Sequence, residues 1–92
     1  MSSPGVLGGD PPAMRTLAGR LEAVSAQLSA VRTNVGAEID AVEWLGADAT
    51  RFRKEWLGTY VPALKQLIDD LNGAAVNIRG DADLQDRTSR AW

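Results

Sequence analysis

A chain of 92 residues without cysteine or histidine has no disulfide, thiolate or imidazole metal ligand, and it lacks the commonest catalytic base. Ten basic and twelve acidic residues give a net charge of −2, and their mixing leaves no basic surface for nucleic acid. We therefore expect one small, non-enzymatic domain with no cofactor, no metal and no nucleic-acid partner.

The first nine residues are rich in Gly, Ser and Pro, and we expect a flexible tail over 1–9. They lack the basic start and apolar run of a signal peptide, and no later stretch is apolar enough to span a membrane. Asp10, followed by Pro11 and Pro12, predicts a helix start at which the Asp side chain caps the free N–H groups.

A first helix over about 11–42 is predicted from apolar residues that recur every seven positions. One row comprises Met14, Leu21, Leu28, Val35 and Val42, and the other comprises Leu17, Val24 and Val31. Together these rows are typical of a coiled-coil seam. The next member of the second row would be Glu38, but the apolar residue there is Ile39, so the repeat slips by one residue. Gly19 and Gly36 are expected to let a neighbouring helix approach closely.

A turn is predicted at residues 43–48, because Gly46 readily adopts a left-handed backbone and Asp48 can cap a helix that begins beside it. Trp44 is too large and apolar for a loose turn. Its indole is therefore expected to close over the end of the hairpin.

A second helix over about 48–87 carries two apolar rows. The first contains Phe52, Trp56, Leu57, Tyr60, Leu64, Leu67, Leu71, Ala74 and Ile78, and the second contains Val61, Ile68, Ala75 and Ala82. Since one partner helix covers a narrower surface than both rows, the second row predicts a further helix pair and hence a dimeric four-helix bundle. Pro62 has no N–H, which predicts a kink near residues 58–62.

The fold class predicted is therefore all-α: an antiparallel two-helix hairpin domain over 10–87 that pairs into a four-helix bundle, with a second flexible tail at 88–92. The expected core and dimer face consist of Leu17, Leu21, Val24, Leu28, Val31, Phe52, Trp56, Leu64, Leu67, Ile68, Leu71 and Ile78.

Trp44-Leu45-Gly46, followed by Phe52 and Trp56 and placed between two long helical patterns, resembles the WXG family of small ESAT-like proteins. The resemblance covers about residues 10–89. It implies a secreted substrate, effector or adaptor of an actinobacterial or firmicute type VII secretion system, exported folded by a membrane ATPase without a cleavable signal peptide. It also implies a homodimer or heterodimer of hairpins, with Trp44 and Gly46 as the turn motif.

The tail departs from the family pattern of a Tyr followed four residues later by an acidic residue. Gln85 and Ser89 stand at that spacing and are the candidate tail signal. The export signal therefore lies either in this variant tail or on a partner chain.

Two other functions remain open, a cytoplasmic coiled-coil scaffold or chaperone-like partner of a larger protein, and a membrane-active amphipathic protein. The polar faces lack the Lys and Arg excess of membrane-surface helices, so membrane contact is not expected. Trp44 is open to a second interpretation, as a residue that only caps the hairpin core. Asp81, Asp83 and Asp86 lack the Gly and the closing Glu of a calcium loop and are interpreted as solvated acids.

Overall fold

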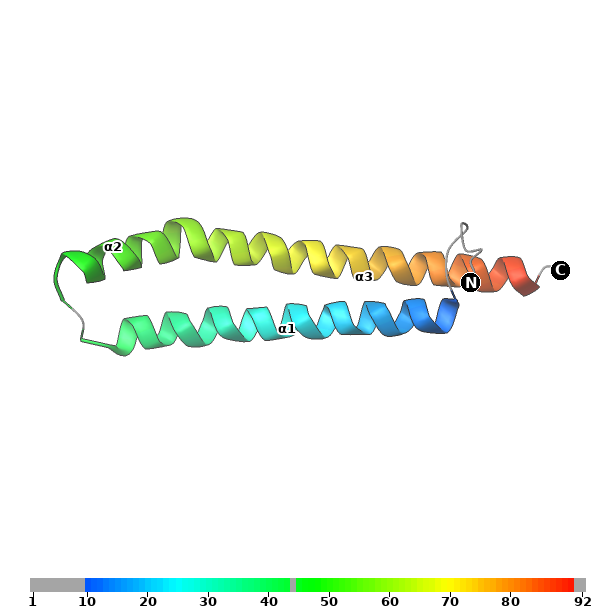
Figure 1. Ribbon diagram of the computed structural model, residues 1–92, viewed down its shortest axis with the longest axis horizontal. Coiled ribbons are helices and arrows are strands. Elements are labelled where there is room, and N and C mark those ends of the chain that lie inside the picture. Colours follow the sequence, from blue (N-terminus) through cyan, green and yellow to red (C-terminus); the bar gives the residue numbers. More distant parts are fainter. Residues whose placement is uncertain (1–9, 44, 91–92) are drawn as a thin grey trace.

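The computed structural model describes residues 10–43 and 45–90, and over this part of the chain every regular element is helical. Helix α1 (Pro11–Ala41) is followed by α2 (Ala47–Glu55), a π turn, η2 (Trp56–Tyr60), and α3 (Val61–Arg90). The last three form one continuous helical arm that runs antiparallel to α1 (Figure 1). The molecule is an elongated rod of 67 × 20 × 19 Å, and the all-α hairpin prediction is confirmed.

Helix α1 begins at Pro11, as predicted, but without the predicted cap. Asp10 occupies the N-cap position with an extended backbone, and its side chain makes no capping hydrogen bond. An Asp side chain normally accepts from the second or third N–H of the helix, and here the second position is Pro12, which has none. The Asp10 carbonyl instead accepts from the Met14 N–H at 2.9 Å.

Gly46, rather than Asp48, is the N-cap of α2. Its φ of 106° and ψ of 177° reverse the chain, and its carbonyl accepts from the Thr50 N–H at 3.1 Å. Asp48 lies in the first turn of α2, where its carboxylate pairs with Arg51. A negative charge at this place also interacts favourably with the positive N-terminal end of the helix dipole. The helix begins at Ala47, within one residue of the predicted start at about 48, whereas the predicted cap is wrong.

Small side chains form the seam between the two arms. Ala18 on α1 and Ala75 and Ala82 on α3 have no exposed surface, and Ser25 is 4% exposed. They recur at heptad spacing on each arm, which lets the backbones approach closely. Larger residues flank the seam and are only half-buried, and no large side chain in the described part of the chain is fully buried.

The two arms therefore use different rows from those predicted. Leu17, Val24 and Val31, predicted as seam residues, are 48, 42 and 47% exposed. Conversely, the row Val61, Ile68, Ala75 and Ala82, predicted to lie beyond the reach of a single hairpin, packs in the seam itself. The physical reason is the closer approach that Ala18 and Ser25 permit, one position along from Leu17 and Val24.

The π turn shifts the second arm by one residue. Buried Ala49 and Trp56 are seven residues apart, but Leu64, the next member of this row, is eight residues beyond Trp56. The Val61 N–H reaches back five residues to the Trp56 carbonyl. The predicted disturbance near Pro62 is thus accommodated as a π turn. Because of the shift, Leu57 is 70% exposed although the regular repeat predicted it on the apolar face.

Candidate functional site: an apolar face and the turn end

One side of the hairpin is apolar on both arms. On α1 the exposed row lies one residue before the seam row, which rotates it by about 100°. On the second arm the row Tyr60, Leu67 and Ala74 likewise precedes Val61, Ile68 and Ala75. Because the arms are antiparallel, residues that precede the seam point to the same side of the hairpin on both. We call this surface the apolar face; it consists of Leu17, Val24, Val31, Tyr60, Leu67 and Ala74.

The apolar face is exposed along most of the rod. Leu67 and Tyr60 are 45 and 44% exposed, values close to those of the row on α1. The half-buried residues between the seam and these rows are Met14, Leu21, Leu28, Val35, Leu64, Leu71 and Ile78. The hairpin thus presents an apolar surface two helices wide.

The π turn extends the apolar face toward the turn end. Phe52 and Tyr60 are eight residues apart, a separation that in a regular α-helix would place them about 80° out of line. The extra residue in η2 brings them onto one side, and their rings lie 6.4 Å apart at 40°. Phe52 is therefore contiguous with the row that begins at Tyr60.

Ion pairs occupy the opposite side of the hairpin. Arg15 donates to Asp83 at 2.8 Å and to Asp86 at 2.6 Å, and Arg79 pairs with Glu22. The hydrogen bond from Arg79 lowers the pKa of Glu22, and the hydrogen bonds to Asp83 and Asp86 raise the pKa of Arg15. We call this side the ion-pair face. These side chains remain 36–63% exposed, so they fix the register of the arms more than they stabilise them.

Trp56 closes the turn end of the hairpin. Its side chain is 8% exposed and lies over Gly36, where an added Cβ would be 3.8 Å from the indole Nε1. A Cβ at Gly36 would make only an ordinary contact and one at Gly19 would have no neighbour within 4 Å, so the predicted close approach does not depend on either glycine. Arg53 donates across the end to the Val42 carbonyl at 3.5 Å.

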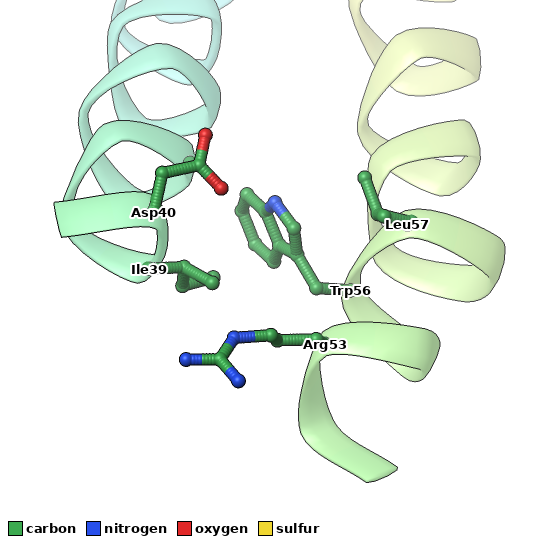
Figure 2. A pocket seen from close by; sticks show the side chains of 6 residues that line it. Ile39, Asp40, Arg53, Trp56 and Leu57 are labelled. Carbon is green, nitrogen blue, oxygen red and sulfur yellow. The ribbon is translucent and has the colours of Figure 1, made fainter. Parts of the chain in front are cut away.

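A notch of about 100 Å³ opens beside Trp56. It is lined by Gly36, Ile39, Asp40, Arg53, Trp56 and Leu57. Figure 2 shows the indole between Asp40 and Arg53, with its nitrogen on the side of Asp40. Gly36 continues the heptad row of Arg15 and Glu22, and Asp40 follows Ile39, which continues the seam row of Ala18 and Ser25, so the notch opens on the ion-pair face and not on the apolar face.

The residues of the predicted secretion motif are only partly described. Trp44 lies outside the described residues, Leu45 is 83% exposed and Gly46 has a positive φ of 106°. Gln85 is half-buried on α3, and Ser89 belongs to the last turn of that helix. Helix α3 ends at Arg90, three residues beyond the predicted end, so residues 88–90 are helical.

The predicted core residues divide into two groups. Trp56 is buried, and the half-buried members are Leu21, Leu28, Phe52, Leu64, Ile68, Leu71 and Ile78. Leu17, Val24, Val31 and Leu67 are exposed in the single chain. Asp83 and Asp86, predicted as solvated acids, both pair with Arg15, a partner 68 and 71 residues away that sequence spacing does not reveal.

Over the residues described, no group of three or more acidic, His or Cys side chains is arranged to hold a metal ion. None of the described helices is both long and apolar enough to cross a membrane. Comparison of the chain with protein-family models, with curated proteins and with solved structures gave no match.

Proposed function

We propose that this chain is a non-enzymatic helical hairpin that pairs through its apolar face with a second hairpin, like or unlike, to form a four-helix bundle. In that form it serves as a secreted substrate or adaptor of a type VII secretion system. The observation that carries the pairing is the apolar face itself, with the described ion pairs between α1 and α3 on the opposite side of the rod.

Burial supports the pairing. Val24, Val31 and Leu67 each leave between 42 and 47% of their surface in water, and no large described side chain is fully buried within one hairpin. Complete burial of such a side chain is worth about 1.5–3 kcal/mol, so covering the exposed half of each contributes roughly half of that. Summed over the face, this gain is comparable with the whole stability of a small domain.

The secretion role is supported by the resemblance of Trp44-Leu45-Gly46 to the W-x-G motif, and by the backbone of Gly46. A φ of 106° is strained for any other residue, which gives the glycine of the motif a physical reason. Leu45, beside it, is 83% exposed and available to a partner.

Sedimentation of the purified chain tests the pairing. We expect a dimer at micromolar concentration, or a monomer that becomes a heterodimer when an unlike hairpin from the same host is added. A fully helical, cooperatively folded monomer that binds no second hairpin contradicts the bundle.

Export is tested by blotting culture supernatant from the native host with and without the export ATPase. Trp44→Ala is expected to abolish export while leaving helix content intact, whereas Trp56→Ala reduces export only as far as it reduces folded protein. Retention of the wild-type chain in cells that export other substrates would favour a cytoplasmic scaffold. Leakage of liposomes at neutral or acidic pH would favour a membrane-active protein.

A further inference from the structure

We infer that the notch beside Trp56 binds a non-helical peptide segment of a partner protein, with one aliphatic side chain in the notch and the flanking peptide groups hydrogen-bonded to Trp56, Asp40 and Arg53. This site is separate from the apolar face. Because the notch opens on the ion-pair face, it stays accessible when a second hairpin covers the apolar face.

An unsatisfied donor is the first observation. The Trp56 residue is only 8% exposed, yet none of the described residues accepts a hydrogen bond from its indole N–H. Buried polar groups are nearly always hydrogen-bonded, so a donor left without an acceptor calls for a group from outside the hairpin. That group must carry an oxygen acceptor.

The charged groups at the rim of the notch limit which kind of acceptor can bind there. Asp40 is exposed and makes no hydrogen bond or ion pair with any described residue. It lies on the same side of the ring as the indole nitrogen (Figure 2), so an anionic acceptor placed there would be repelled. A peptide group avoids the conflict, because its C=O accepts from the indole while a neighbouring N–H donates to Asp40.

Arg53 supplies a second donor on the other side of the ring. Its guanidinium has five N–H groups and, among the described residues, only one long hydrogen bond, to the Val42 carbonyl. A second carbonyl of the bound segment satisfies it. Two donors and one acceptor around a single site match a short stretch of free backbone, which the interior of a helix cannot offer because its groups are already paired.

The volume and lining of the notch determine which side chain of the bound segment fits into it. A cavity of roughly 150 Å³ holds a benzene ring, so a notch of about 100 Å³ holds one aliphatic side chain such as Leu. Ile39 and Leu57 line it, and Leu57 is 70% exposed without the occupant. An aromatic side chain is too large for this volume.

The test uses N-acetyl-leucine N-methylamide, a single residue with both peptide groups, and follows the indole N–H resonances of the full chain by NMR. The Trp56 resonance is assigned by its loss in Trp56→Phe. We expect a saturable shift of this resonance at millimolar ligand. The glycine analogue, which lacks the side chain, and isobutanol, which lacks the peptide groups, should each bind at least about tenfold more weakly.

Three variants separate binding from folding. Gly36→Leu fills the notch from α1, where the first added atom makes only an ordinary contact, and should abolish the shift with helix content unchanged. Should this variant lose helix, Asp40→Ala and Leu57→Ser alter exposed rim positions and are each expected to weaken binding several-fold in folded protein. Val76→Ser, at an exposed position of α3 away from the notch, is the matched control and should bind as the wild type does.

The inference is overturned if the ligand produces no saturable shift, or if the shift survives in folded Gly36→Leu or in both rim variants. It is also overturned if the indole N–H shows contact only with water and ignores the ligand. Sedimentation of the same samples reports pairing separately, so a failure here leaves the bundle standing.

Discussion

Gly46 combines a φ of 106° with a ψ of 177°, a region of backbone space that is open essentially to glycine alone. We predict that Gly46→Ala lowers the free energy of unfolding by about 1–3 kcal/mol, because Ala must adopt a strained backbone or shift the start of α2. Gly80→Ala is the matched control. Gly80 lies within α3 with open space around its Cα, so this change should stabilise the helix by about 1 kcal/mol. Urea unfolding measures both, and equal effects of one sign would contradict the backbone argument.

Trp56 and Leu57 are neighbours in sequence with opposite environments, at 8 and 70% exposure. Trp56→Ala is expected to cost about 3–5 kcal/mol, the range for removing a buried aromatic side chain. Leu57→Ala should change stability by no more than about 0.5 kcal/mol, because most of its side chain is already in water. Thermal melts followed by circular dichroism distinguish the two. A larger loss from Leu57→Ala would place the π turn at a different residue.

At the level of the elements, the sequence predicted where the helices lie better than which sides meet. Heptad recurrence located α1 to within one residue at its C-terminal end. The recurrence could not determine which side of α1 faces the other arm, because Leu17 and Ala18 are adjacent and each begins a row that repeats every seven residues. The choice depends on how closely Ala18, Ser25, Ala75 and Ala82 let the backbones approach, which is a property of both arms together.

The heptad repeat also could not predict the π turn. Gly58 and Pro62 indicated where the helix is disturbed, because proline lacks the N–H that its fourth-preceding carbonyl needs. They did not indicate whether a kink or an inserted residue resolves the conflict. The insertion moves Trp56 into the row of Leu64 and exposes Leu57, and so it also creates the notch, which no sequence motif announced.

The ion pairs between α1 and α3 make stability depend on pH. Arg79 lowers the pKa of Glu22 in the folded chain, so this pair contributes stability above the pKa of Glu22 in the unfolded chain. The contribution is lost as the pH falls through the lowered folded pKa, in the acidic range. We predict that urea unfolding at neutral and acidic pH shows a smaller acid loss for Glu22→Gln than for wild type. Glu55→Gln, at an exposed residue of α2, is the control and should keep the wild-type loss.

At the scale of the whole molecule, the apolar face is predicted to determine assembly without determining the fold of one hairpin. Val24→Asp and Leu67→Asp place a carboxylate where pairing would bury it at a cost of several kcal/mol, but each residue is 42–45% exposed in the single chain. We expect both variants to sediment as monomers with reduced but substantial helix content.

Val76→Asp is the matched control for assembly, because Val76 is 67% exposed and follows the seam residue Ala75, which places it on the other side of α3. It should associate as the wild type does. Dimers of wild-type affinity in both Val24→Asp and Leu67→Asp would show that the hairpins meet elsewhere.

The described chain starts and finishes at the same end of the rod, where the last turns of α3 project past the beginning of α1 (Figure 1). Tension applied between residues 10 and 90 therefore peels the arms apart layer by layer, from the ion pairs of Arg15 toward Trp56. Tension between residues 10 and 48 instead loads the whole seam along its length, and should require a greater force in single-molecule pulling. A motor that draws the chain in by its α3 end would open the ion pairs of Arg15 first and would reach the contact between Trp56 and Gly36 only close to the turn.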